Sequence, residues 1–202
     1  LAKTLHVFHT SGVRFANRYD VFRAEIEKYR LGAMEHHLQE FFDENMIRKL
    51  LKIEKEAEQK LSVSKQGIST HNDFIFQNIL VAKNNMVYLL DFEYAGLNKK
   101  GVIFYDLGYV FRDSFFNPPR MSPKTFERFL SAADKAYKKK LDRNQIYWAV
   151  IAGLLVGIWW GVLRYVSVPQ NERTYFYTYV HIGVRGVSGL YSKIKKGGQD
   201  CT

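Results

Sequence analysis

The fold of this chain is decided by the stretch His71-Asn72-Asp73-Phe74-Ile75-Phe76-Gln77-Asn78 and by the triplet Asp91-Phe92-Glu93, which begins thirteen residues after Asn78. Between them, Asn78-Ile79-Leu80-Val81 and Met86-Val87-Tyr88-Leu89-Leu90 have the apolar character of short strands, and Lys83-Asn84-Asn85 has that of a turn. The sequence therefore predicts a hairpin whose two open ends bring Asn78 and Asp91 together.

This arrangement of carboxylates and a carboxamide is typical of phosphoryl-transfer sites of the protein-kinase type. In such sites an Asp accepts the substrate's hydroxyl proton, an Asn five residues later binds Mg²⁺, and the Asp of a D-F-x motif holds the metals that bridge the ATP phosphates. Asp and Asn are also common in loops, because their side chains cap turns. Asp73 and Asn78 alone would therefore mean little, but two such motifs around a predicted hairpin favour the kinase-type site.

Length and composition limit the remaining possibilities. A chain of 202 residues is long enough for one domain with a substantial core. Its single cysteine, Cys201, excludes a disulfide within the chain and fits a reducing compartment. The first residues show no signal-peptide pattern, so we expect a cytoplasmic protein. Because the chain does not open with methionine, we expect further residues to precede Leu1 in the native protein.

The net charge of +10 is large for this length. Much of it lies in Lys138-Lys139-Lys140, Lys193, Lys195 and Lys196, at the ends of predicted helices. Lysines there are stabilised by the helix dipole and usually form a solvated face. The functional alternatives are attraction to ATP, to an anionic surface or to nucleic acid. The sequence contains no nucleic-acid-binding motif, which disfavours the last.

Apolar periodicity predicts a mainly helical chain. Helices are expected over Leu1 to Thr10, Asp20 to Leu31, Met34 to Leu61 with a break near Asp43, and Ser122 to Lys140. A further helix is expected after Asp142 and ends at Pro169, and a last helix runs from about Asn171 toward Lys196. Ser122 is predicted to cap its helix with Pro123 at the first position, Asp142 and Gln145 to form a capping-box-like pair, and Asn171 to cap the last helix. The segment from Glu93 to Tyr105 is expected to be irregular.

Residues 146–163 carry no charge, which reaches the lower limit for a membrane span. Gly153, Gly157 and Gly161 recur at four-residue spacing, a pattern that also supports helix packing in membranes. The alternative is a central helix buried on all sides in a helical domain. The amphipathic neighbouring segments favour this buried helix.

We therefore expect a mainly α fold with a small β-hairpin, forming one domain over residues 1–202. The catalytic loop and metal hairpin would occupy about residues 68–93, and a helical core about residues 122–196.

With these motifs in place, the chain resembles the C-terminal lobe of the choline/ethanolamine kinase group, within the aminoglycoside-phosphotransferase-like (protein-kinase-like) superfamily. The residues from His71 to Leu80 are similar to the group's catalytic loop, and Asp91-Phe92-Glu93-Tyr94-Ala95-Gly96-Leu97-Asn98 is similar to its D-[FW]-E-Y-x-x-x-N segment. Asp106-Leu107-Gly108 with Phe111 and Asp113 is similar to the next block, an Asp-led motif followed by an acidic residue. Leu5-His6 is similar to the leucine-histidine pair that follows the hinge, and Gly157 to Leu163 to a tryptophan-bearing core helix.

The resemblance implies roles for individual residues and two cofactors. Asp73 would be the catalytic base, Asn78 and Asp91 would bind Mg²⁺, and Glu93 would support the second metal or the substrate. Asp113, Tyr94, Tyr109 and Trp160 would bind the substrate's cationic group, while His71 and Asp106 would order the loop. ATP would be the co-substrate.

The same resemblance covers only the C-terminal part of the kinase fold. Nothing before Leu5-His6 matches the β-rich N-lobe with its phosphate-covering loop and strand lysine, so we expect either a fragment of a longer protein or a natural C-lobe with a vestigial site. Three functions stay open: a small-molecule kinase with little activity as this fragment, a non-catalytic binding module, and a small membrane protein anchored by residues 146–163. Choline is the leading acceptor, with ethanolamine, thiamine and amino sugars as alternatives; the oligomeric state is open.

Overall fold

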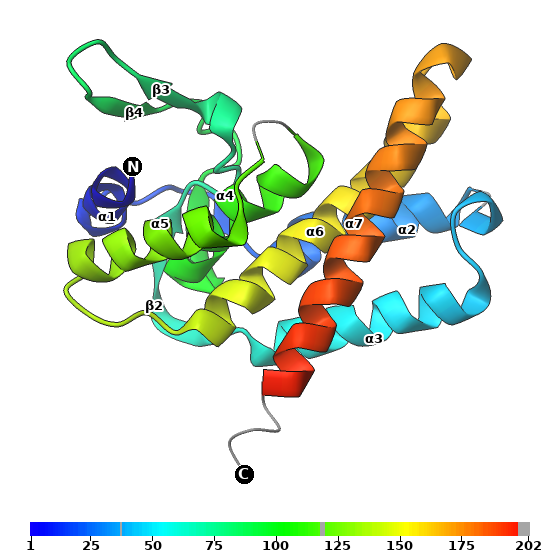
Figure 1. The fold of residues 1–202 in the computed structure, drawn as a ribbon, viewed down its shortest axis with the longest axis horizontal. Helices are drawn as coiled ribbons and strands as arrows, with labels where there is room; N and C mark the ends of the chain where they lie inside the picture. Colours follow the sequence, from blue (N-terminus) through cyan, green and yellow to red (C-terminus); the bar gives the residue numbers. More distant parts are fainter. Residues whose placement is uncertain (37, 118–119, 198–202) are drawn as a thin grey trace.

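Two long helices, α6 (Arg143–Ser167) and α7 (Gln170–Gly197), pack against each other through the middle of the molecule (Figure 1). The computed structural model describes residues 1–36, 38–117 and 120–197. The other helices are α1 (Ala2–Thr10), the π-helix η1 (Phe22–Glu27), α2 (Lys28–Met34), the 3₁₀ helices η2 (Leu38–Glu40) and η3 (Phe76–Asn78), α3 (Glu44–Lys60), α4 (Val102–Phe116) and α5 (Pro123–Ala136). The strands are β1 (Arg18–Tyr19), β2 (Val63–Thr70), β3 (Ile79–Val81), β4 (Val87–Leu89) and β5 (Gly96–Lys100). The predicted fold class, mainly helical with a small hairpin, is confirmed.

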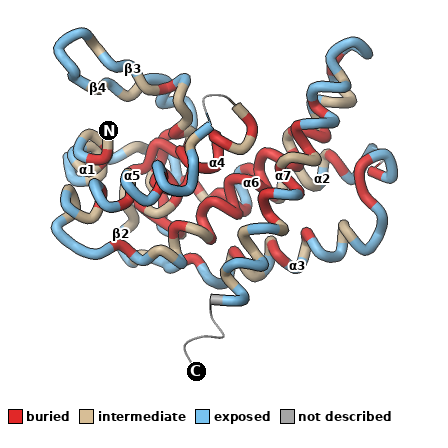
Figure 2. The backbone as a smooth tube through the Cα atoms, in the orientation of Figure 1, coloured by how far each residue is buried: buried red, intermediate tan, exposed pale blue. Residues whose placement is uncertain are grey.

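Helix α6 is the buried centre of this arrangement (Figure 2). Every residue from Trp148 to Trp159 is buried. The helix is long and apolar enough to cross a membrane, but 83% of its apolar window is buried inside the molecule. The prediction of a buried helix over residues 146–163 is therefore confirmed.

The glycines of α6 allow its neighbours to approach. A Cβ atom at Gly157 would lie 2.8 Å from both the Arg112 guanidinium and the Phe116 ring of α4. At Gly161 it would lie 2.9 Å from Val180 of α7. The four-residue spacing thus serves close packing between helices inside this domain.

Two predicted helix starts, at Ser122 and Asp142, are confirmed, and the break predicted near Asp43 is the start of a third helix. Asp43 accepts a hydrogen bond from Met46 N at 2.7 Å, Ser122 Oγ accepts one from Thr125 N at 3.1 Å, and Asp142 Oδ1 accepts from the next turn of α6. These bonds satisfy backbone donors that a helix start leaves unpaired.

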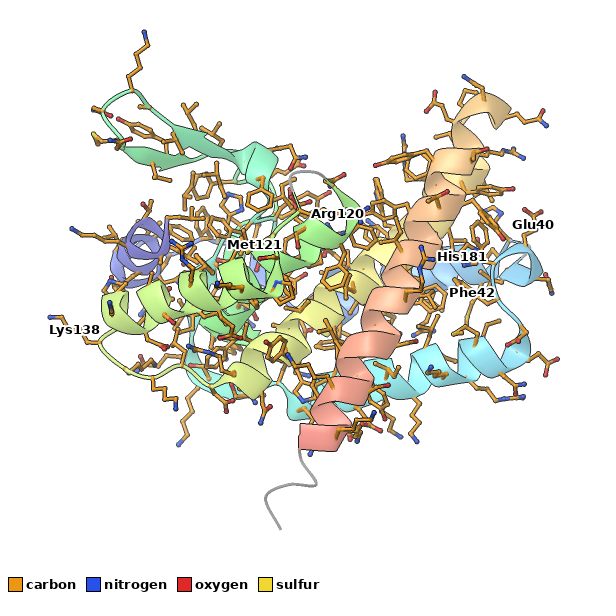
Figure 3. The ribbon with its side chains drawn as sticks, viewed as in Figure 1. Glu40, Phe42, Arg120, Met121, Lys138 and His181 are labelled. Carbon is orange, nitrogen blue, oxygen red and sulfur yellow. The ribbon has the colours of Figure 1, made fainter. Side chains whose placement is uncertain are left out.

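Other details of the helix ends differ from the prediction. Gln145 does not return to the backbone of Asp142; its side chain joins Lys60 O and Ser62 N, each at 2.8 Å, and so ties α6 to the end of α3. Asn171 is not a cap, because α7 already begins at Gln170. Helix α5 ends at Ala136 rather than near Lys140, and the exposed Lys138 side chain points into solvent (Figure 3).

The chain contains more β-structure than expected. The predicted hairpin is confirmed as β3 and β4, with Leu80 opposite Tyr88. The segment from Glu93 to Tyr105, however, is not irregular: it contains β5 and the start of α4. Strand β5 lies between β1, which is parallel to it, and β2, which is antiparallel. The loop over residues 71–78 directly follows β2, so this second sheet fixes where that loop begins.

Candidate active site

The loop after β2 is held by one buried carboxylate. Asp106 of α4 accepts hydrogen bonds from His71 N and Asn72 N, each at 2.8 Å, and from His9 Nε2 at 2.8 Å. Asp106, His71 and Asn72 are all fully buried, so these bonds are shielded from water. Asn72 has a φ of 68°, a left-handed conformation that Asn tolerates better than most residues. The contacts match the ordering of the loop that the resemblance implies for His71 and Asp106.

Asp73 and Asn78 form a hydrogen-bonded pair at the end of this loop. Asn78 Nδ2 donates to Asp73 Oδ2 at 2.9 Å and to the Asp73 carbonyl at 3.0 Å. Burial raises the pKa of the Asp73 carboxyl, while the charge of Arg112 and the Asn78 hydrogen bond oppose the rise. A carboxyl whose pKa is moved upward toward the working pH is suited to accept a proton.

The hairpin places Asp91, the first residue of the Asp91-Phe92-Glu93 motif, close to the loop that carries Asp73 and Asn78. Leu90 N donates to Asn78 O at 2.9 Å, and His71 Nε2 donates to Leu90 O at 2.8 Å. The negative charge of Asp91 also contributes to the raised pKa of Asp73. Asp91 is exposed and has a φ of 59°, a conformation that carries strain in a non-glycine residue. The backbone thus places Asp91 next to the Asp73–Asn78 pair.

The donors present here fit an open Mg²⁺ site. Within the described residues, no cluster of three or more His, Cys, Asp or Glu side chains forms a closed metal site. Mg²⁺, however, commonly keeps several waters and binds through one or two carboxylates together with substrate phosphates. The Asn78 amide nitrogen is already engaged by Asp73, which leaves the amide oxygen of Asn78 as the atom that could serve as a hard ligand. The side chains of Asn78 and Asp91 are the ones that would hold the ion.

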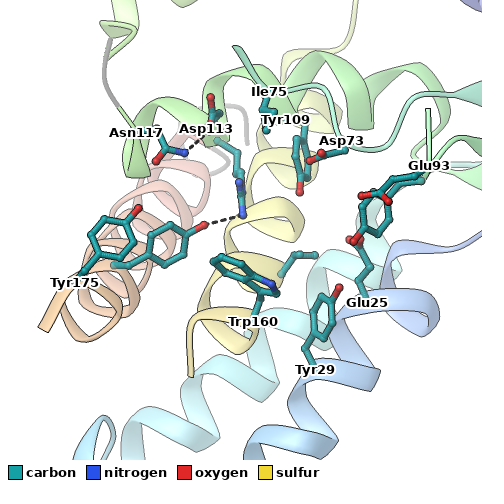
Figure 4. Close-up of a pocket in the computed structure, with 14 residues that line it drawn as sticks. Glu25, Tyr29, Asp73, Ile75, Glu93, Tyr109, Asp113, Asn117, Trp160 and Tyr175 are labelled. Atoms are coloured by element: carbon teal, nitrogen blue, oxygen red, sulfur yellow. Dashed lines mark hydrogen bonds between the residues drawn. The ribbon is translucent and has the colours of Figure 1, made fainter. Parts of the chain in front are cut away.

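A cavity of about 320 Å³ opens beside Asp73 (Figure 4). Its lining consists of acidic, aromatic and a few apolar side chains: Glu25, Tyr29, Asp73, Ile75, Glu93, Tyr94, Tyr109, Arg112, Asp113, Asn117, Val156, Trp160, Tyr175 and Tyr179. The predicted site residues Asp73, Glu93, Tyr94, Tyr109, Asp113 and Trp160 are therefore brought together. Asn78, Asp91, His71 and Asp106 do not line this cavity.

Asp113 is more engaged than the sequence indicated. Its Oδ2 accepts a hydrogen bond from Phe76 N at 3.2 Å, and its Oδ1 accepts one from Asn117 Nδ2 at 2.8 Å (Figure 4). The residue is fully buried. Asp113 therefore ties the catalytic loop to α4 in addition to lining the cavity.

Glu25 is a cavity residue that the sequence did not reveal. It is 6% exposed, and its Oε2 accepts a hydrogen bond from Tyr19 OH at 2.7 Å. Burial raises the pKa of the Glu25 carboxyl to about 7. The available signal was its spacing, because Glu25 lies four residues from both Val21 and Tyr29 on the apolar face of its segment, whereas Glu27 does not. The packing of η1 against α6 buries that face. Tyr29, one turn later, reaches the same cavity.

Arg112 was also missed, and it occupies one wall of the cavity. Its Nε donates to Gly153 O at 3.0 Å, and its Nη2 donates to Tyr179 OH at 3.1 Å. The guanidinium lies 4.8 Å from the Tyr109 ring centroid and 4.7 Å from that of Phe116. The glycine spacing in α6 was a signal, since it provides the space that this side chain fills.

Known proteins resemble this chain in sequence and in fold. The family model for choline/ethanolamine kinase matches residues 1–124. The choline kinase LicA from Streptococcus pneumoniae has a TM-score of 0.67 at 22% identity, covering 93% of this chain and 62% of that one. A choline/ethanolamine kinase family protein from Mesorhizobium loti gives 0.71 at 18% identity (94% and 60%), and an ethanolamine kinase from Plasmodium vivax gives 0.63 at 16% (94% and 57%). At these identities the structures show the shared fold, and the chain spans about 60% of the length of each.

One curated protein gives a different name. A Bacillus cereus protein named 3-dehydroquinate synthase is 32% identical over 126 residues, which are 58% of this chain but 34% of that protein. This name does not describe a kinase, and the match covers a minor part of the protein that bears it. The family model, in contrast, covers more than half of this chain, including the catalytic loop, the hairpin and Asp106. The chain belongs to the choline/ethanolamine kinase family.

Proposed function

We propose that this chain supplies the catalytic lobe of an ATP- and Mg²⁺-dependent phosphotransferase acting in the cytoplasm on the hydroxyl of a small amino alcohol. The observation that carries the proposal is the position of Asp73. It forms part of the cavity wall and is at the same time hydrogen-bonded to Asn78, the predicted metal ligand. The proposed base and one proposed metal ligand are thus hydrogen-bonded to each other at the edge of a cavity of substrate size.

Asp73 would accept the proton of the acceptor hydroxyl. Burial raises the pKa of this carboxyl, which makes it a better proton acceptor than an exposed Asp. The Asn78 amide fixes one carboxylate oxygen, so the other is free to meet the hydroxyl. Positioning of this kind accounts for much of the catalysis of phosphoryl transfer.

Asn78 and Asp91 would hold the cation on the nucleotide side of Asp73. Mg²⁺ bound there would neutralise charge that develops on the transferred phosphoryl group. Glu93 lines the cavity and is exposed, which suits a supporting role toward the second metal or the acceptor. A relative of known structure, LicA, has been solved in complex with AMP, which supports an adenine nucleotide as the second substrate.

The charge of the cavity favours a cationic acceptor. Four of its lining residues carry carboxyl groups (Glu25, Asp73, Glu93 and Asp113), and Arg112 is the one cation among the lining residues. A ligand with an ammonium group would therefore enter a field of opposite sign. Nucleic acid is disfavoured as a ligand of this cavity by the same field.

A radiolabelled transfer assay tests this function. ATP would be supplied with and without Mg²⁺ to a panel of choline, ethanolamine, thiamine and amino sugars. We expect Mg²⁺-dependent transfer to an amino alcohol by the native protein, including any sequence that precedes residue 1 in its gene. The 202-residue chain alone should show little or no transfer, because it spans about 60% of its structural relatives. A native protein that binds the panel without transferring phosphate would instead be a non-catalytic binding module.

A further inference from the structure

Glu25 leaves one carboxylate oxygen without a partner inside the acceptor cavity. Oε2 accepts the hydrogen bond from Tyr19, but Oε1 has no hydrogen bond among the described residues. No Lys, Arg or His of the described chain forms an ion pair with this carboxylate. A buried carboxylate is unfavourable unless a cation or hydrogen-bond donors compensate its charge. Glu25 therefore presents Oε1 to the cavity as an acceptor that a ligand N–H group can satisfy.

Arg112, the cation in the cavity wall, already has hydrogen-bond partners other than Glu25. Its hydrogen bonds go to Gly153 O and Tyr179 OH, and its guanidinium lies over the ring of Tyr109. The positive charge of Arg112 lowers the pKa of Glu25, but the guanidinium makes no hydrogen bond or ion pair with this carboxylate among the described residues. The cavity therefore keeps an unpaired acceptor next to a side chain that cannot turn to satisfy it without losing its own bonds.

The aromatic rings of the cavity are also partly occupied. The Arg112 guanidinium is 4.8 Å from the Tyr109 centroid, and the Tyr179 ring stacks on Phe116 with centroids 3.9 Å apart. The guanidinium of Arg164 lies 5.9 Å from the Trp160 centroid. A quaternary ammonium has no N–H bond and depends on free ring faces together with nearby negative charge. Here several ring faces already have a partner from the protein.

We propose that Glu25 selects acceptors whose ammonium group retains at least one N–H bond, so that primary, secondary and tertiary amino alcohols bind better than the quaternary one. The proposal rests on the proposed function and narrows its acceptor class. An N–H donor would satisfy Oε1 through a charge-assisted hydrogen bond, which is among the stronger interactions available to a buried carboxylate. A fully methylated nitrogen would desolvate Oε1 and leave it unpaired.

Binding of a methylation series to the 202-residue chain tests the proposal without requiring phosphoryl transfer. Ethanolamine, N-methylethanolamine, N,N-dimethylethanolamine and choline would be titrated by calorimetry at pH 8. The largest loss of affinity should fall at the last methyl group, where the final N–H bond disappears, and should be at least about tenfold. In Glu25→Gln this step should shrink to less than about threefold, while the matched variant Glu27→Gln, on the same helical segment but outside the cavity lining, should keep it.

A second readout uses the unmodified protein and covers the case in which Glu25→Gln fails to fold. Near pH 6 Glu25 is protonated for most of the time, since burial raises its pKa to about 7. The groups that influence it are Tyr19, Tyr105, Tyr109, Arg112, Asp73, Lys28, Tyr29 and Tyr94. The tyrosines have pKa values raised further above their ordinary range, so they do not titrate near pH 6. The preference for N–H-bearing amines should therefore be smaller at pH 6 than at pH 8.

The possible outcomes distinguish a failure of the proposed role of Glu25 from a failure of the proposed phosphotransferase function. Choline binding as tightly as N,N-dimethylethanolamine, or a preference unchanged in Glu25→Gln and at pH 6, overturns the role of Glu25 and leaves the phosphotransferase proposal standing. Failure of all four amines to bind overturns both, because the cavity would then not be an acceptor site.

Discussion

Asn78 donates its side-chain amide to both the carboxylate and the carbonyl of Asp73, at 2.9 and 3.0 Å. The proposed base and the proposed metal ligand, five positions apart in sequence, are therefore one hydrogen-bonded unit. With its nitrogen engaged, Asn78 has only its oxygen left to offer a cation. A change at either residue should affect both proton transfer and the use of Mg²⁺.

Asn78→Ala should move the pH dependence of the reaction as well as slow it. The Asn78 hydrogen bond lowers the Asp73 pKa against the effect of burial, so its loss should raise that pKa further. The acidic limb of the kcat/KM profile should then shift to higher pH, and the Mg²⁺ concentration for half-maximal rate should increase. Asn84→Ala, in the exposed hairpin turn, is the matched control. An unchanged acidic limb in Asn78→Ala would show that Asp73 does not titrate as the base.

Asp106→Ala should destabilise the protein strongly. It removes the acceptor of two buried backbone N–H groups, at His71 and Asn72, and of the His9 side chain. Leaving buried donors unpaired should lower the free energy of unfolding by about 3–5 kcal/mol, measured by urea denaturation. Asp142→Ala, which removes an exposed helix cap, should lower it by only about 1 kcal/mol. Equal effects of the two substitutions would mean that Asp106 does not anchor the loop.

Gly157→Ala and Gly189→Ala should have opposite effects on stability. A Cβ at Gly157 would meet Arg112 and Phe116 at 2.8 Å, so Ala there should destabilise by about 1–3 kcal/mol and displace the guanidinium from the cavity wall. Gly189, in α7, has nothing within 4 Å of the added Cβ, and Ala should stabilise by up to about 1 kcal/mol through helix propensity. Thermal unfolding of both variants measures the contrast. A neutral Gly157→Ala would argue against tight packing of α4 on α6.

Glu25→Gln should stabilise the fold at alkaline pH. The folded protein holds the Glu25 proton up to about pH 7, whereas the unfolded chain releases it near 4.5. Between these values the folded state binds more protons, so its stability falls as pH rises and the penalty is complete above about pH 7. The gain from Gln should be on the order of 3 kcal/mol at pH 8 and small at pH 5. A gain independent of pH would mean that Glu25 titrates normally. Such a penalty at a functional site fits the common trade of stability for activity.

The sequence predicted those parts of the fold that local chemistry determines. The hairpin followed from the apolar runs around Lys83-Asn84-Asn85, and the starts of α5 and α6 followed from Ser122 and Asp142. Near Asp43 only a break was expected, and α3 starts there. Strands β2 and β5 were missed because their sequences, VSKQGIST and GLNKK, are polar and become strands only by pairing with each other. Asn171 resembled a cap, but the helix begins one residue earlier, at Gln170.

The candidate site divides in the same way. Asp73, Asn78 and Asp91 could be found because their spacing in sequence is set by the loop and hairpin that hold them. Glu25, Arg112 and Tyr179 were not found from the sequence, because they reach the cavity from three different helical segments and only the packing of those segments brings them together. Asp113, which the resemblance predicted to bind the substrate, does line the cavity, but its bonds to Phe76 N and Asn117 depend on the tertiary position of the loop.

The most direct test of this account is the rate of phosphoryl transfer by the native protein and its Asp73→Asn variant, measured with Mg²⁺-ATP and saturating amino alcohol. Asn has nearly the shape of Asp but cannot accept the hydroxyl proton as a base. We expect kcat to fall about 10²-fold or more with folding and nucleotide binding retained. A variant that turns over as fast as the unmodified protein would contradict the assignment of Asp73 as the base.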